Sequence, residues 1–199
     1  YARQDKQFLS GEVITMSVVA KMIQMAGATK VIFVDIHSNT ALNHFKIRTE
    51  NVSAIPELAK YFKKMKLKNP LVVSPDMGGS LRAKEFASLL NTDFIALKKS
   101  RNRKTGKVQI QSSKVDVNGR DLIVIDDMIS TGGSVVKATQ FLKRQKCKRV
   151  FVACTHGLFV GDAERSIKKA GVSQIISTNT IPSSTSKVDV SGVIAKSIQ

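Results

Sequence analysis

The stretch from Leu122 to Ser134 reads LIVIDDMISTGGS and decides the fold. Its first four residues, Leu122 to Ile125, form an apolar run that is typical of a strand buried on both faces. Asp126 and Asp127 follow, and the small polar loop from Ser130 to Ser134 then leads into a helical pattern. Glycine lets the backbone approach a ligand closely, and the N-terminus of a helix favours an anion. We therefore expect a site for a phosphate that is flanked by hydroxyl groups.

The rest of the chain alternates apolar strand patterns with helical patterns. This order predicts an α/β fold with a mostly parallel sheet and helices on both faces. The other expected strands are Lys30–Ile36, Leu71–Ser74, Asp93–Lys98, Arg149–Cys154 and Gln174–Ser177. The expected helices are Glu12–Ala26, Asn39–Phe45, Pro56–Met65, Leu81–Leu90, Val135–Arg144, Asp162–Ala170 and Val188–Ile198, whereas Ile47–Ser53 reads as a polar connection and a candidate domain boundary.

Polar residues suited to chemistry recur directly after the expected strands. In open α/β sheets, ligands bind at the edge formed by the carboxyl ends of the strands. The residues at this edge are Asp35 and His37, Asp76, Asp126 and Asp127, and His156. Asp35 and His37 are two positions apart, so on a strand they would point to the same side. This shared location indicates one ligand site at the carboxyl edge of the sheet.

The charge balance raises the question of nucleic-acid binding. The chain has 199 residues, with 32 Lys+Arg against 15 Asp+Glu and a formal net charge of +17. Such a balance suggests a nucleic-acid partner. However, Lys60 to Lys68 lie on and after one short helical stretch, and the chain has no Trp and only 2 Tyr for base stacking. We therefore expect solvated lysine faces and polyanionic small substrates, and no nucleic-acid partner.

The remaining composition is that of an intracellular globular protein. No apolar run approaches the roughly 20 residues that span a bilayer, and the chain does not open on a signal-peptide pattern. Cys147 and Cys154 lie in or beside an apolar stretch, which favours two reduced thiols over a disulfide or a metal pair. Because the chain begins at Tyr1 on a polar motif, we read it as a fragment or as a chain without its N-terminal part.

Three further stretches carry side chains suited to a nucleotide. Arg3 and Gln4, in YARQDK, provide a planar donor for phosphate and a mixed donor and acceptor, although a plain surface loop is the alternative. His37 is a candidate metal or phosphate contact, and a capping histidine is its alternative. The run from Lys99 to Lys107 is either a solvated loop or a flexible cationic lid over phosphates, and the two readings are compatible.

Six motifs together resemble those of one enzyme family. YARQDK, VDIHS, SPDMGGS, IDDMISTGGS, THGLF and TNTIP occur in the order and at about the spacing of ribose-phosphate diphosphokinases, or PRPP synthases. The resemblance covers essentially the whole chain, whereas IDDMISTGG alone would indicate only the wider phosphoribosyltransferase superfamily. It implies two similar α/β domains. Residues 1–52 would end the N-terminal domain, and residues 53–199 would form the C-terminal domain with the ribose 5-phosphate site, its last helix packing back on the first domain.

The resemblance also implies the reaction and its residues. ATP and ribose 5-phosphate would give AMP and PRPP with Mg²⁺, and the anomeric hydroxyl would attack the β-phosphorus in line. Positioning and charge neutralisation supply most of the rate in such chemistry. The resemblance assigns Arg3, Gln4 and His37 to ATP, His37 and Asp76 to metal, Asp126 and Asp127 to the ribose hydroxyls, Ser130, Thr131, Gly132, Gly133 and Ser134 to the 5-phosphate, and Lys99 and Arg101 to catalysis as lid cations. A cytoplasmic homo-oligomer without a membrane partner is expected.

Three departures from the family pattern limit what carries over. Many members have an acid at the position of Ser130, so this loop has one fewer negative charge. Gln7 to Glu12 replaces a charged stretch tied to ADP regulation and follows the archaeal-type pattern instead. The family's N-terminal part, which supplies an adenine-binding loop to a neighbouring subunit, has no counterpart in the chain.

Two other functions are consistent with parts of the sequence. A phosphoribosyltransferase that consumes PRPP shares the IDDMISTGG loop, but it would not need YARQDK or the cationic run. A non-catalytic regulatory subunit with the same fold would not need His37, Lys99 or Arg101. Release of AMP from ATP and ribose 5-phosphate separates the diphosphokinase from both.

Overall fold

A computed structural model describes residues 3–7, 9–101, 108–111 and 116–198. The chain divides into two compact units. Unit 1 comprises Tyr1–Ala54 and Ser191–Gln199, and unit 2 comprises Ile55–Val190. The division after Ala54 lies two residues from the expected domain boundary at residue 52. None of the helices in the described ranges combines the length and the apolar character needed to cross a bilayer.

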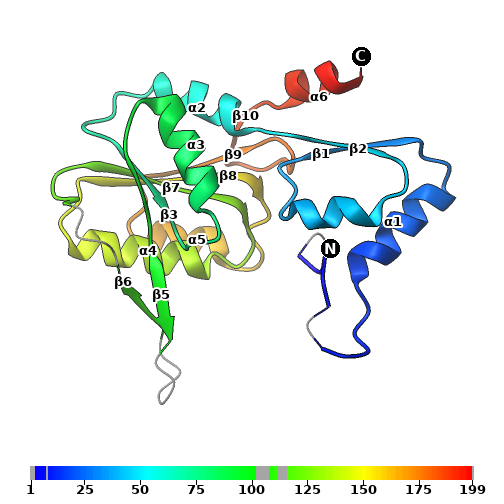
Figure 1. Cartoon of the computed structure of the whole chain (residues 1–199). Coiled ribbons are helices and arrows are strands. Elements are labelled where there is room, and N and C mark those ends of the chain that lie inside the picture. The colour runs from blue at the N-terminus through cyan, green and yellow to red at the C-terminus, as the bar shows by residue number, and fades with distance from the viewer. Residues whose placement is uncertain (1–2, 8, 102–107, 112–115, 199) are drawn as a thin grey trace. The chain divides into compact units, whose positions relative to one another are not determined.

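Unit 1 is a small parallel pair of strands with helices around it (Figure 1). Its elements are α1 (Thr15–Met25), β1 (Lys30–Val34), the short 3-10 helix η1 (Asn39–His44), β2 (Arg48–Val52) and α6 (Ser191–Ile198). The strands β1 and β2 pair in parallel, with Lys30 opposite Arg48. Side chains of α1 and η1, including Met16, Ala20 and Ala41, form its core.

The terminal helix α6 is held to this strand pair. Ser197 Oγ donates to Glu50 Oε1 at 2.6 Å, and Lys30 Nζ donates to the Ser197 carbonyl. Lys30 also pairs with Glu50 at 2.9 Å. Residues from the two ends of the chain therefore belong to one unit.

Two expectations for unit 1 are wrong. Ile47–Ser53 is not a plain connection, because Arg48–Val52 forms β2; its polar residues are tolerated since the strand is only partly buried. Strand β1 ends at Val34, and Asp35 has a left-handed φ of 43°. The alternation of a strand therefore does not extend to His37. Buried Asp35 accepts the Ala54 amide at 3.1 Å, while His37 is exposed.

Unit 2 is a doubly covered parallel sheet, as expected. In the part of the chain that the structure describes, its six strands run in the order β10-β9-β8-β7-β3-β4, and every neighbouring pair is parallel. The strands are β3 (Leu71–Ser74), β4 (Phe94–Ala96), β7 (Asp121–Ile129), β8 (Arg149–Gly157), β9 (Gln174–Thr178) and β10 (Ser186–Val188). The expected fold class is confirmed.

Helices cover both faces of this sheet. Helices α2 (Ile55–Lys63) and α3 (Ser80–Leu90) pack on one face, and α4 (Gly133–Arg144) and α5 (Ala163–Lys169) pack on the other. Alternate residues of β7 enter the two cores, since Leu122 and Val124 join the α4 side while Ile123 and Ile125 join the α2 side. This burial on both faces explains why β7 begins as a continuous apolar run.

The central strands are longer than the apolar patterns suggested. Strand β7 continues through Asp126 and Asp127 to Ile129, because β8 pairs with it as far as Gly157. Strand β10 was not expected at all; it is a short edge strand beside β9. Two further strands, β5 (Lys98–Arg101) and β6 (Val108–Gln111), form a separate antiparallel pair. Cys147 and Cys154 are both buried and free.

Candidate active site

The two acids of the central motif lie inside β7, near its carboxyl end. Asp127 is buried and Asp126 is half-buried, and Asp126 Oδ1 accepts the Asp127 amide at 3.0 Å. Arg82 of α3 brings Nη1 to 3.8 Å from Oδ1 of each carboxylate. One guanidinium therefore bridges both acids.

This arrangement changes the acidity of Asp126. Burial, and then the hydrogen bond and the charge of Asp127, raise the pKa of Asp126 to about 7, while Arg82 acts in the opposite direction. Two carboxyl groups this close do not readily both ionise. Near neutral pH, Asp126 therefore exchanges between the acid and the carboxylate, and it can donate a hydrogen bond to a hydroxyl or accept one from it.

The loop from Ser130 to Ser134 connects β7 to α4 (Figure 1). Gly132 has a left-handed φ of 73° and occupies the N-cap position of α4. Since glycine carries no capping side chain, the first amides of α4 are directed to whatever lies beyond the helix end. These amides and the helix dipole favour an anion, and a phosphate fits this chemistry. We name residues Ser130–Ser134 the phosphate loop.

A second strand-to-helix turn lies beside the first, because β3 is the neighbour of β7. In the turn after β3, Asp76 Oδ1 accepts the amides of Gly78 and Gly79 at 3.1 and 3.4 Å. Ser74 Oγ donates to the Asp76 carbonyl at 2.6 Å, and a Cβ on Gly79 would lie only 2.6 Å from that hydroxyl. Half-buried Asp76 therefore has a structural role in shaping this turn.

Polar groups also meet at the ends of β8 and β9. His156 Nδ1 lies 2.9 Å from Thr180 Oγ1. The Thr180 and Thr178 hydroxyls donate to the Thr155 carbonyl at 2.9 and 2.7 Å. Because the Thr180 proton is directed to that carbonyl, its oxygen accepts from His156, which favours the tautomer with the proton on Nδ1. The THGLF and TNTIP motifs therefore make one hydrogen-bonded group.

The candidate ATP residues belong to unit 1. Arg3, Gln4 and His37 are all exposed, and the Gln4 carbonyl accepts the Met16 amide at 3.1 Å. Buried Asp5 accepts from the Thr40 hydroxyl, and its carbonyl lies 2.8 Å from His44 Nε2. These contacts fix the backbone that carries Arg3 and Gln4.

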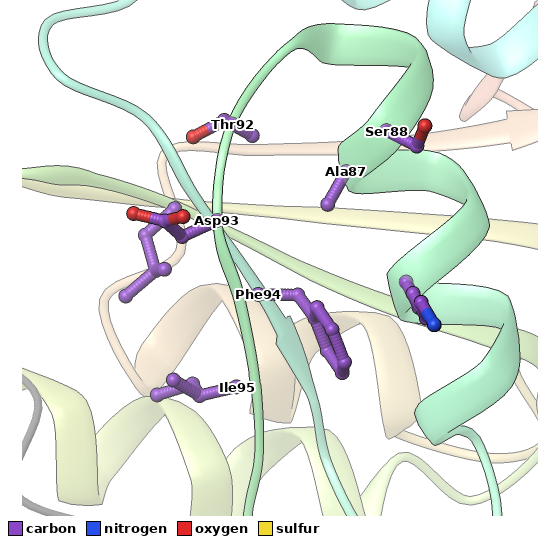
Figure 2. Close-up of a pocket in the computed structure, with 8 residues that line it drawn as sticks. Ala87, Ser88, Thr92, Asp93, Phe94 and Ile95 are labelled. Atoms are coloured by element: carbon purple, nitrogen blue, oxygen red, sulfur yellow. The ribbon is translucent and has the colours of Figure 1, made fainter.

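A cavity of about 440 Å³ lies elsewhere in unit 2. Figure 2 shows Ala87 and Ser88 of α3 on one side and the stretch from Thr92 to Ile95 on the other. It also involves Leu71, the first residue of β3, so it lies at the amino ends of β3 and β4. None of the candidate site residues whose side chains the structure describes lines it.

Comparison with known proteins identifies the family of this chain. The chain is 37% identical to a ribose-phosphate pyrophosphokinase of Sulfurisphaera tokodaii, over all of the chain and 69% of that protein. The chain belongs to the ribose-phosphate pyrophosphokinase family. It is also 37% identical to the Staphylococcus aureus protein of that name, of which it covers 64%. The chain thus spans about two thirds of these two relatives.

Other comparisons agree with membership of the ribose-phosphate pyrophosphokinase family. The family described as phosphoribosyl transferase domain matches residues 50–190. The crystal structure of phosphoribosylpyrophosphate synthetase from Mycobacterium smegmatis superposes with a TM-score of 0.85 at 28% identity, over 100% of this chain and 67% of that one. The recognition made from the six motifs is therefore confirmed.

For this pyrophosphokinase family member, the structure brings part of the predicted site together. Asp126, Asp127 and the phosphate loop are consecutive on β7 and its helix, and Asp76 follows the adjacent strand. Lys99 and Arg101 do not lie in an irregular loop, because both are in β5, where Lys99 pairs with Ile110 and Arg101 with Val108. Residues 102–107 of the predicted lid fall outside the described residues.

Arg82 is a site residue that reading the sequence did not single out. It lies near the start of α3, where the positive end of the helix dipole disfavours a cation. An arginine at such a position is a signal that an anion lies nearby. Here that anion is the carboxylate pair on β7.

Proposed function

We propose that this chain is a ribose-phosphate diphosphokinase, which transfers the diphosphoryl group of ATP to the anomeric hydroxyl of ribose 5-phosphate. The oxygen of that hydroxyl bonds to the β-phosphorus and its proton is lost to water. The bond from the β-phosphorus to the oxygen that bridges to the α-phosphate breaks, and AMP leaves with that oxygen as PRPP forms. One observation carries the proposal. The carboxylate pair on β7, which Arg82 bridges, lies a few residues before the start of α4, where backbone amides are available to an anion. Family membership supplies the reaction.

The sugar would be held by β7. Asp126 and Asp127 accept hydrogen bonds from the 2- and 3-hydroxyls, and Arg82 keeps the two carboxylates in place. The amides of the phosphate loop would take the 5-phosphate, with hydroxyls of Ser130, Thr131 and Ser134 beside them.

The triphosphate would be bound by residues from other elements. Arg3, Gln4 and His37 contact ATP in this proposal, and Lys99 and Arg101 of β5 neutralise the charge that develops on the transferring group. A cation that acts mainly in the transition state lowers kcat more than it weakens binding. Lys99 and Arg101 are therefore the proposed catalytic residues.

Magnesium fits the oxygen donors present. No group of three or more His, Cys, Asp or Glu that could hold a metal occurs among the described residues. Mg²⁺ is commonly held by one or two carboxylates together with substrate phosphates, so such a group is not required. Asp76 supplies a half-buried carboxylate for the ion in this proposal, and His37 is the other proposed metal contact. When bound, the ion would neutralise charge on the phosphate oxygens.

The wider proposal concerns the whole protein. Unit 2 would be the C-terminal phosphoribosyltransferase-like domain, and unit 1 would be the end of the N-terminal one together with the last helix. The protein would act in the cytoplasm as a homo-oligomer. Its oligomeric state is measured by light scattering after size exclusion.

The decisive assay measures AMP and PRPP after incubation with ATP, ribose 5-phosphate and Mg²⁺. The diphosphokinase forms both in equal amounts. Consumption of PRPP and a nucleobase with release of pyrophosphate, and no AMP from ATP and ribose 5-phosphate, would instead identify a phosphoribosyltransferase. Binding of both substrates without turnover by a protein of the relatives' full length would identify a regulatory subunit. Lys99→Ala should reduce turnover far more than it weakens ribose 5-phosphate binding. Equal losses in both would contradict the role of Lys99.

A further inference from the structure

The segment that follows β8 is bonded to the start of the phosphate loop. The amides of Leu158 and Phe159 both donate to the Ile129 carbonyl at 3.0 Å, and the Val160 amide donates to the Ser130 carbonyl at 3.0 Å. Ile129 ends β7, and Ser130 begins the phosphate loop. Three hydrogen bonds from one short segment therefore fix the two carbonyl groups at the loop entrance.

These bonds also set the direction of two loop amides. A trans peptide is planar, and its C=O and N–H groups point in opposite directions. The Ile129 carbonyl shares a peptide plane with the Ser130 amide, and the Ser130 carbonyl shares one with the Thr131 amide. Since both carbonyls point toward the segment after β8, the Ser130 and Thr131 amides point away from it. The segment thus aims two donors of the phosphate loop.

Phe159 gives this segment its shape. Its φ of 43° is left-handed, which is uncommon for a residue other than glycine, and it is half-buried against the core on the α4 side. The ring occupies the space next to Gly157, where an added Cβ would lie 2.4 Å from Phe159 Cε2. A strained conformation persists only where the surroundings determine it. The packed ring is what holds the strained turn.

Helix α5 packs against Gly132 of the phosphate loop. A Cβ on Gly132 would lie 3.0 Å from Ile167 Cδ1 and 3.6 Å from Ala163 Cβ. The turning residue of the phosphate loop therefore lies directly against α5. Leu158 to Ile167 is one continuous piece of chain that touches the loop at its entrance and at its turn, and we name it the brace.

We propose that the brace is a positioning element for the 5-phosphate, with Phe159 as the positioning residue on which it depends. The inference rests on the proposed function, because it assumes that the phosphate loop binds the 5-phosphate of ribose 5-phosphate. Small errors in the placement of binding groups have large effects on a bound ligand. Losing the Phe159 ring would let the segment relax and would misdirect the Ser130 and Thr131 amides.

The test compares two ring deletions in the same core. Phe159→Ala removes the ring from the brace, and Phe141→Ala removes a half-buried ring of α4 that packs on the same cluster. Calorimetry with ribose 5-phosphate and with inorganic phosphate measures affinity, and thermal unfolding measures stability. We expect Phe159→Ala to raise both dissociation constants about tenfold or more, and Phe141→Ala to change them less than about twofold at a similar loss of melting temperature. Equal weakening by both variants would overturn the proposal.

A second variant separates positioning from stability. Phe159→Gly relieves the left-handed strain, so it should unfold at a higher temperature than Phe159→Ala while binding ribose 5-phosphate no better. Recovery of binding together with stability would overturn the brace. Failure of the proposed function gives a different result, because the unsubstituted chain would then bind neither ribose 5-phosphate nor phosphate. Failure of the brace proposal alone leaves that binding intact.

A third measurement needs no substitution. Added inorganic phosphate should shift the amide resonances of Leu158, Phe159 and Val160 together with those of Thr131 to Gly133. A response of the loop amides alone would show that the brace is not coupled to the ligand, and it would overturn the proposal.

Discussion

Asp126 is the residue in which stability and function oppose each other. In the proposed function its carboxyl binds a ribose hydroxyl beside Asp127 and Arg82, and burial in that position raises its pKa to about 7. A raised pKa means that the folded protein binds a proton that the unfolded chain releases near the ordinary value of about 4. Stability from this group therefore falls as the pH rises from about 4 to about 7.

Replacement of the Asp126 carboxyl by a neutral group should remove the loss of folding stability at neutral pH. We expect Asp126→Asn to be more stable than the unsubstituted chain at pH 7.5, by about 1–3 kcal/mol, and to lose most of that advantage at pH 5. Urea unfolding at the two pH values measures it, and Asp162→Asn, at the exposed N-cap of α5, serves as the control for loss of one negative charge. The same difference at both pH values would contradict the raised pKa. Binding of ribose 5-phosphate should fall in Asp126→Asn at either pH.

Arg82 is the cation that pairs with Asp126 and Asp127. Its removal should lower the free energy of unfolding most at the pH where Asp126→Asn raises it most. Arg82→Ala leaves the two carboxylates of β7 without the guanidinium at 3.8 Å. We expect a loss of about 1–3 kcal/mol at pH 7.5 and a smaller loss at pH 5, where Asp126 is protonated. Urea unfolding is again the measurement. A loss of the same size at both pH values would show that Arg82 acts through packing and not through charge.

At the scale of elements, the apolar runs and the strand-to-helix order were readable from the sequence. Leu122 to Ile125 identified the central strand because both of its faces are buried, and the turn residues of the phosphate loop identified the helix start. What the sequence could not provide came from tertiary pairing. Strand β7 includes two acids because β8 supplies a partner, and Arg48–Val52 forms a strand despite its polar residues. The Arg82 bridge depends on how α3 packs, which no local pattern encodes.

Replacing the adjacent glycines of the phosphate loop with Ala should change the free energy of unfolding in opposite directions. Gly132→Ala forces a left-handed φ of 73° on a residue with a Cβ and brings that Cβ to 3.0 Å from Ile167; we expect a loss of about 1–3 kcal/mol. Gly133→Ala adds a Cβ with no atom within 4 Å at the first position of α4. It should stabilise the chain by a few tenths to about 1 kcal/mol through helix propensity. Chemical unfolding of the pair checks both signs, and a loss for both would contradict this local geometry.

At the scale of the whole molecule, the parallel fold of unit 2 places helix starts and basic side chains at opposite edges of the sheet. Helices that connect parallel strands run back across the sheet, so their starts lie at the carboxyl edge and their ends at the amino edge. Basic residues occupy the last turns of α2, α4 and α5, where the helix dipole favours cations. They are Lys60, Lys63, Lys143, Arg144, Lys168 and Lys169. The fold thus leaves amides at the carboxyl edge for anions while much of the positive charge lies at the other edge.

The net charge of +17 leads to a last prediction, in which stability and binding respond oppositely to salt. Mutual repulsion of an excess of like charges destabilises a compact chain, and salt screens it over a Debye length of about 10 Å at 0.1 M. Raising NaCl from about 20 to about 300 mM should therefore raise the melting temperature. The same screening weakens the attraction of the doubly charged ribose 5-phosphate, so its dissociation constant should rise. Replacing the exposed Lys66 and Lys148 with Gln, away from the carboxyl edge, should reduce the first effect and leave the second. A melting temperature that falls with salt would mean that ion pairs such as Lys30 with Glu50, and not repulsion, dominate the charge energetics.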